Sequence, residues 1–106
     1  MHHTAECRDT VLITPDTDVV ASQAEALCAT LREALDQGTT NIILDLQEVE
    51  MVDALGLGVL IAAHNTLHEY GGSFIVVNVC ADILRLLQLM CLDQHFAVTA
   101  REMACN

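Results

Sequence analysis

The chain has 106 residues, the size of one domain, and 53% of them are hydrophobic, so we predict a single globular domain over residues 1–106. Four arginines against 15 acids give a formal net charge of −11. The chain therefore lacks the clustered Lys and Arg side chains that bind phosphates, which excludes nucleic acid and an anionic membrane surface as partners. The absence of lysine excludes Schiff-base and Walker-type chemistry. Because eleven acids lie in residues 1–53, an electrostatically selected partner should be basic and should contact that half.

Apolar periodicity and turn residues predict, in chain order, two strands, a helix, a strand, a helix, a strand, a helix and a last strand. Their ranges are 3–8 (a weak pattern), 10–14, 22–37, 41–46, 55–70, 73–79, 81–90 and 96–98. The strand at 41–46 lacks clean alternation, which is typical of a central strand covered on both faces. Strands that alternate with helices indicate an α/β fold with right-handed crossovers.

Two pairs of residues are expected to start helices. Ser22 and Glu25 fit a capping box at the start of the first helix, and Gly38 should end that helix. Thr99 and Glu102 fit a second capping box, which predicts a short helix at the end of the chain.

The most informative stretch is residues 53–58, Asp-Ala-Leu-Gly-Leu-Gly, between an acidic connection and a predicted helix. It marks a helix N-terminus at the carboxyl end of a strand, the edge where ligands and partners of α/β folds gather. Gly56 and Gly58 would permit the close approach of another backbone, and exposed N–H groups would favour an anion. The plainer interpretation is that Asp53 caps the helix and the glycines only allow tight packing of the helix on the sheet.

The same stretch resembles the motif of a STAS domain. This domain family comprises the bacterial anti-sigma factor antagonists and the C-terminal domains of sulfate transporters. The segments that carry the resemblance are residues 41–58, Gly71-Gly72, Val77-Asn78 and residues 83–93, within a match over roughly residues 10–100. The resemblance implies an α/β fold with a small mixed sheet of four to five strands and helices packed mainly on one side.

In antagonists of this family, the residue after the motif aspartate is usually a serine or threonine. A serine kinase, which is itself the anti-sigma factor, phosphorylates that residue, and the phosphorylated antagonist releases the kinase. This sequence has Ala54 there, so the resemblance implies an antagonist that cannot be phosphorylated at this position and stays competent to bind. The resemblance also implies that the protein is a non-catalytic regulator of transcription in the cytoplasm, which binds no cofactor and does not insert into a membrane. A homodimer is compatible with this expectation.

We predict the partner-binding surface from charge and position around the motif. Its residues are Asp16, Asp18, Glu48, Glu50, Asp53, Leu55, Gly56, Leu57 and Gly58. The alternative interpretation is that the acidic residues only form a solvent-exposed face and contact no partner. Two other functions stay open: an accessory STAS subunit of an ABC-type membrane transport system, and a sensor of an anion bound at the helix start, which the local acids disfavour.

Other candidate chemistry is weaker. His64 and His68 lie four apart on a predicted helix, a spacing that can hold zinc, but the sequence suggests no third ligand. Cys91 and His95 lack a visible orienting acid, so we predict neither a metal site nor an enzyme. Five cysteines without a CxxC pair are expected to be reduced thiols, with Cys28 and Cys80 as small core residues.

Overall fold

The structure, a computed structural model, describes residues 2–7 and 9–101, which form one five-stranded sheet, three α-helices and one short 3-10 helix. The strands are β1 (His2–Cys7), β2 (Thr10–Pro15), β3 (Asn41–Asp45), β4 (Ser73–Val79) and β5 (Ala97–Ala100). The helices are α1 (Ala21–Asp36), α2 (Ala54–Glu69), α3 (Ala81–Leu89) and the short 3-10 helix η1 (Leu92–Gln94). All the predicted strands and helices of residues 3–98 are therefore present, with ends that differ by only a residue or two.

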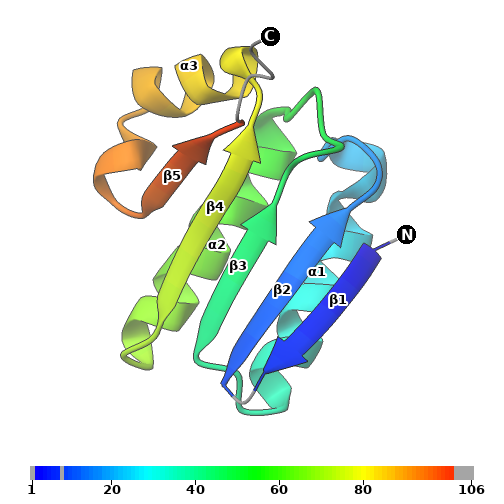
Figure 1. Cartoon of the computed structure of the whole chain (residues 1–106), viewed down its shortest axis with the longest axis vertical. Helices are drawn as coiled ribbons and strands as arrows, with labels where there is room; N and C mark the ends of the chain where they lie inside the picture. Colours follow the sequence, from blue (N-terminus) through cyan, green and yellow to red (C-terminus); the bar gives the residue numbers. More distant parts are fainter. Residues whose placement is uncertain (1, 8, 102–106) are drawn as a thin grey trace, which may run out of the picture.

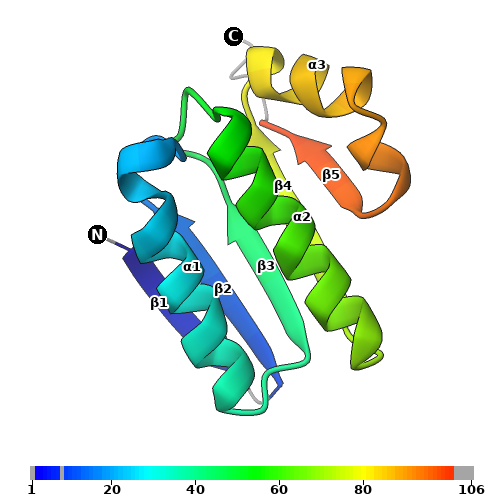
Figure 2. The ribbon, with the colours of Figure 1, turned by 180° about the vertical axis from the view of Figure 1, so that it is seen from behind.

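The strands lie in the sheet in the order in which they occur in the chain. β1 pairs with β2 antiparallel, and each later strand pairs parallel with the one before it. Figures 1 and 2 show α1 and α2 side by side on one face, with α3 beyond the carboxyl ends of β4 and β5. The predicted mixed sheet with helices mainly on one side is confirmed.

The central strand β3 is covered on one face only, so the prediction of cover on both faces was wrong. Ile42 and Leu44 are 1% and 0% exposed beneath the helices, whereas Ile43, on the opposite face, is only half-buried. The sequence misled because an isoleucine occupies the open face. Its apolar character hides the alternation that a sheet with helices on one face normally shows.

The core is aliphatic and lies between that sheet face and the two long helices. α1 contributes Leu27 and Leu31 and α2 contributes Leu60 and Leu67, each 4% exposed or less. Burying one such side chain contributes about 1.5–3 kcal/mol, so these four anchor both helices on the sheet.

The predicted helix starts were wrong at both capping boxes. The N-cap of α1 is Val20, which makes no side-chain cap bond, and Ser22 lies inside the helix. Thr99 belongs to β5, where strand pairing with β4 replaces the predicted helix start, and Glu102 lies outside the described residues. Gly38 does follow the end of α1, with a φ of +88° that suits glycine.

Candidate functional site

The start of α2 lies at the carboxyl edge of the parallel strands, where the loops after β2 and β3 run side by side. Val19 and Val52 form an isolated parallel bridge between these loops. The Val19 amide donates to the Met51 carbonyl at 3.0 Å, and the Asp53 amide donates to the Val19 carbonyl at 3.2 Å. The predicted site is thus built on two loops that are distant in sequence and joined by backbone hydrogen bonds.

Asp53 connects the starts of both long helices. Its Oδ1 accepts from the Gly56 amide at 2.8 Å, which caps α2, and its Oδ2 accepts from the Ala21 amide at 2.8 Å, at the start of α1. The capping interpretation is confirmed, and the second bond explains why α1 needs no capping box of its own. These bonds place a carboxylate where a bound anion would lie, which further disfavours the anion-sensor alternative.

Acid should weaken this double cap. The amides of Gly56 and Ala21 hold the pKa of Asp53 below its ordinary value of 3.8. The stabilisation is therefore complete above about pH 4 and is lost as the pH falls through the folded-state pKa. We expect Asp53→Asn to lower the stability at pH 7, because the NH2 group of asparagine would oppose one of the two backbone amides. In a plot of the urea midpoint against pH, the same change should also flatten the decline at acid pH.

The exposed acid Glu48 offers the matched control for this change. It makes no hydrogen bond or ion pair within the described part of the chain. Glu48→Gln should therefore leave both the midpoint at pH 7 and the acid limb unchanged. An Asp53→Asn protein with the same acid limb as the wild type would contradict the double cap.

The two motif glycines have different surroundings. Gly56 is buried, and a Cβ built on it would overlap the Val19 carbonyl oxygen and stand 2.9 Å from Val19 Cγ1. Gly58 is exposed, with no atom within 4 Å of its built Cβ. The plainer interpretation, tight packing within the molecule, therefore holds for Gly56 and not for Gly58, and the approach of a partner's backbone to Gly58 stays a prediction.

Two acids of the predicted surface also have structural roles in the loop before α2. Asp18 Oδ1 accepts from the amides of Glu50 and Met51, at 2.9 and 3.2 Å. The Glu50 carboxylate pairs with Arg101 Nη1 at 2.9 Å, although its side chain is 68% exposed. These acids hold the loop in place whether or not they also contact a partner.

Arg101 is the residue that sequence analysis missed, because the predicted capping box assigned it to a helix start. Its Nη2 donates to the carbonyls of Leu46, Gln47 and Val49, at 3.2, 2.7 and 3.2 Å. One guanidinium thus holds most of the loop between β3 and α2 from the end of β5. No local pattern could have revealed this contact, because its partners lie more than 50 residues earlier in the chain.

The structure divides the nine predicted partner-binding residues into accessible and internal ones. Those with exposed side chains or backbone are Asp16, Glu48, Glu50, Leu55 and Gly58. Leu57 and Gly56 are buried, while Asp18 and Asp53 are half-buried and bonded to backbone amides. Met51 and Leu55, 58% and 62% exposed, flank the exposed Ala54. We call the exposed residues Met51, Ala54, Leu55 and Gly58 the motif surface.

The histidine pair on α2 gains a third neighbour. The rings of His64 and His68 are 5.8 Å apart, and the ring of His95, from the segment after η1, lies 6.3 Å from His64. His64 also contacts the ring of Phe96 at 5.5 Å between centroids. Over the described ranges, no group of three or more His, Cys, Asp or Glu side chains has a geometry that could hold a metal ion.

This histidine cluster predicts a second pH dependence, near neutrality. Burial lowers the pKa of His64 from 6.5, and the charges of His68 and His95 lower it further. Because His64 binds a proton more readily in the unfolded chain than in the folded one, protonation favours unfolding. The stabilisation from neutral His64 is therefore complete above about pH 6.5 and is lost as the pH falls through its folded-state pKa. His64→Phe should flatten the decline of the urea midpoint between pH 7 and pH 5. An unchanged decline in that variant would assign the effect to other groups.

Among the described residues, Cys28, Cys80 and Cys91 are free thiols. Cys28 and Cys80 are half-buried at the edge of the core and not inside it, whereas Cys91 is exposed. Within the described residues, no helix is both long and apolar enough to cross a membrane.

Comparisons with known proteins agree on one fold. A protein of Thermotoga maritima, proposed to be an anti-sigma factor antagonist, matches with a TM-score of 0.88 at 23% identity, over 97% of this chain and 87% of its own. SpoIIAA, an anti-sigma factor antagonist of Bacillus, matches in its phosphorylated form with a TM-score of 0.75 at 21% identity, over 92% of this chain and 90% of its own. The murine anion transporter Slc26a9 matches with a TM-score of 0.73 at 19% identity, over 92% of this chain and 17% of the transporter.

These identities are low, so the solved structures show the fold that the proteins share. The family assignment comes from the sequence, because the family model described as STAS domain matches residues 3–103. The mixed sheet, the helices on one face and the motif at the start of α2 fit that match. The chain belongs to the STAS domain family.

Proposed function

We propose that this chain is a non-catalytic, cytoplasmic antagonist that binds an anti-sigma factor kinase through the motif surface. The observation that carries the proposal is Ala54. It is exposed at the first position of α2, directly after the capping Asp53, where antagonists of this family have the phosphorylated serine or threonine. A kinase that docks over this position would meet a methyl group in place of a hydroxyl.

The site explains how a phosphate there would act as an off-switch. A phosphoryl group adds about −1.5 to −2 charges, and at this position it would adjoin the Asp53 carboxylate. Asp53 already accepts the two helix-start amides, so these amides are not available to compensate the new charge. Repulsion and desolvation would then oppose a docked partner. With Ala54 this switch is absent, and the protein stays in the binding-competent form.

The remaining composition of the surface supports a partner with a basic, partly apolar face. Met51 and Leu55 offer exposed apolar contacts, and the exposed acids Asp16, Glu48 and Glu50 lie in the adjoining loops. Buried apolar anchors supply most of the affinity of an interface, while rim charges mainly steer association. We therefore expect the apolar pair to set the dissociation rate and the acids to set the salt dependence of association.

Restoring the hydroxyl tests the proposal. With the kinase-type anti-sigma factor of the same genome and ATP, Ala54→Ser should acquire one phosphate, while the wild type acquires none. Phosphorylation should weaken binding to the kinase at least about tenfold, because like charges juxtaposed at an interface cost several kcal/mol. Mass spectrometry and calorimetry measure the two effects.

Two outcomes would contradict the proposal. The first is a wild-type protein that does not bind the kinase with ADP or ATP present, and the second is a serine variant that binds but is never phosphorylated. Co-purification of the wild type with an ABC ATPase, in place of a kinase, would favour the transport alternative.

A further inference from the structure

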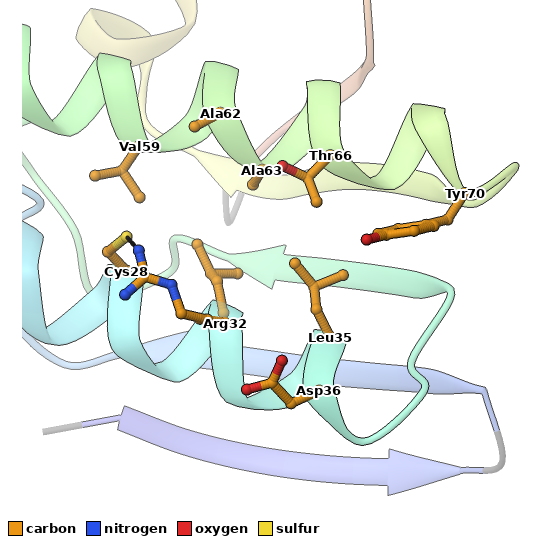
Figure 3. A pocket seen from close by; sticks show the side chains of 10 residues that line it. Cys28, Arg32, Leu35, Asp36, Val59, Ala62, Ala63, Thr66 and Tyr70 are labelled. Atoms are coloured by element: carbon orange, nitrogen blue, oxygen red, sulfur yellow. Dashed lines mark hydrogen bonds between the residues drawn. The ribbon is translucent and has the colours of Figure 1, made fainter.

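The outer face of α1 and α2 carries a groove that the motif surface reaches only at Leu55. A cavity of about 300 Å³ lies between the two helices, and a second of about 460 Å³ adjoins it, with Cys28, Arg32 and Val59 lining both (Figure 3). Ala62 lines the first cavity and Ala24 lines the second, and both side chains are too small to fill the space. The first cavity is at the lower end of the size range of about 300–1,000 Å³ for small-molecule sites.

The walls of the first cavity are mostly apolar. Leu31 and Leu35 line it from α1, and Val59 and Ala63 line it from α2. Tyr70, 70% exposed, lies at the end of the cavity farthest from Arg32, and Figure 3 shows its hydroxyl directed toward the space between the helices. An apolar slot with a few polar groups at its rim is the usual form of a site for a small molecule.

Two opposite charges border this slot without pairing with each other. Arg32 and Asp36 are one helical turn apart on α1, yet within the described residues neither forms an ion pair. The only hydrogen bond that the Arg32 guanidinium makes in that part of the chain is to Cys28 Sγ, at 3.7 Å. Figure 3 shows the guanidinium turned toward Cys28 and away from the Asp36 carboxylate. The order of the two residues favours their separation, because Arg32 precedes Asp36, and an acid placed four residues before a base forms a better ion pair than the reverse.

We propose that this groove binds a small apolar zwitterion of the α-amino acid class. Its carboxylate would lie on Arg32, its ammonium group on Asp36, and its apolar side chain against Leu35 and Val59. A simple anion would face the Asp36 carboxylate, and a simple cation would face the Arg32 guanidinium. Only a ligand with both charges and an apolar body complements both groups and the apolar walls.

A titration with L-phenylalanine, followed by two-dimensional NMR of the whole chain, tests the proposal. We expect chemical-shift changes confined to residues that line the groove, in fast exchange at millimolar concentration. Two matched probes each lack one charge: N-acetyl-L-phenylalanine has no ammonium group, and L-phenylalaninamide has no carboxylate. Each should bind about two- to fivefold more weakly, because the charges on the protein are solvent-exposed. Glycine, which lacks the apolar body, should produce no shifts.

Variants assign the two charges. Arg32→Gln should weaken L-phenylalanine binding about two- to fivefold and should abolish its preference over the amide. Asp36→Asn should have the same effect on the preference over the N-acetyl compound. Glu33→Gln, an exposed acid of α1 that does not line the groove, should change neither preference.

Several outcomes would overturn the proposal. They are the absence of shifts at any concentration, shifts that map outside the groove, equal binding of the N-acetyl compound, and an unchanged preference in both charge variants. The titration needs no protein partner, so its failure leaves the proposed docking function untouched, and the converse also holds.

Discussion

Gly56→Ala should destabilise the protein by at least about 3 kcal/mol, or prevent its folding, although it adds a single methyl group. The new Cβ would overlap the Val19 carbonyl oxygen and stand 3.0 Å from the Val19 carbonyl carbon. That carbonyl also accepts the Asp53 amide, so the loop after β2 cannot move away without breaking the bond that aligns the two loops. Urea unfolding followed by circular dichroism measures the loss.

Gly58→Ala is the matched control, two residues further along the same helix. Its built Cβ meets no atom within 4 Å, and alanine favours a helix over glycine by about 0.8–1.0 kcal/mol. We therefore expect a gain in stability of up to about 1 kcal/mol. The same substitution should thus lower the free energy of unfolding at Gly56 and raise it at Gly58. Equal effects at both positions would contradict the packing of α2 against Val19.

Arg101→Met should cost about 3 kcal/mol and should loosen the loop between β3 and α2. Methionine keeps much of the apolar stem of the side chain but removes every donor to the carbonyls of Leu46, Gln47 and Val49. A hydrogen bond to a charged group contributes about 1.5–3 kcal/mol, and carbonyls left without a donor add to the loss. Denaturant unfolding measures the free energy, and amide hydrogen exchange of residues 46–53 should become faster in the variant.

Two controls separate the carbonyl contacts from the ion pair and from charge alone. Glu50→Gln removes the pair with Arg101 but leaves the carbonyl bonds, and should cost no more than about 1 kcal/mol, because the Glu50 side chain is 68% exposed. Arg85→Met removes an exposed arginine of α3 and should leave the stability nearly unchanged. If the loss in Arg101→Met equals that in Glu50→Gln, then the carbonyl contacts contribute nothing.

The order and type of the elements followed from local pattern. Spacing of apolar residues located α1, α2 and α3, and β-branched runs located β2 and β4, because these periods are properties of each segment alone. The errors at the helix starts occurred where a residue from elsewhere in the chain satisfied a local need. α1 begins without a side-chain cap of its own because Asp53, 32 residues later, accepts the Ala21 amide.

The candidate site was located by the sequence but not resolved by it. The motif at residues 53–58 identified the start of α2, since Asp53 has the residue type and position of a helix cap. The sequence treated Gly56 and Gly58 alike, because two glycines in one pattern carry no local difference. Only the folded chain distinguishes them, by placing the Val19 carbonyl against one and solvent against the other.

The sequence by itself determined the α/β order of elements, the acidic character of the first half and the alanine at the motif. Each of these is a property of residue identity and of spacing along a single segment. The tertiary structure decided which side chains of the motif are exposed, what Arg101 holds, and that Arg32 and Asp36 border one groove without pairing. These facts depend on contacts between segments that are far apart in the chain, which only the folded sheet and its two long helices bring together.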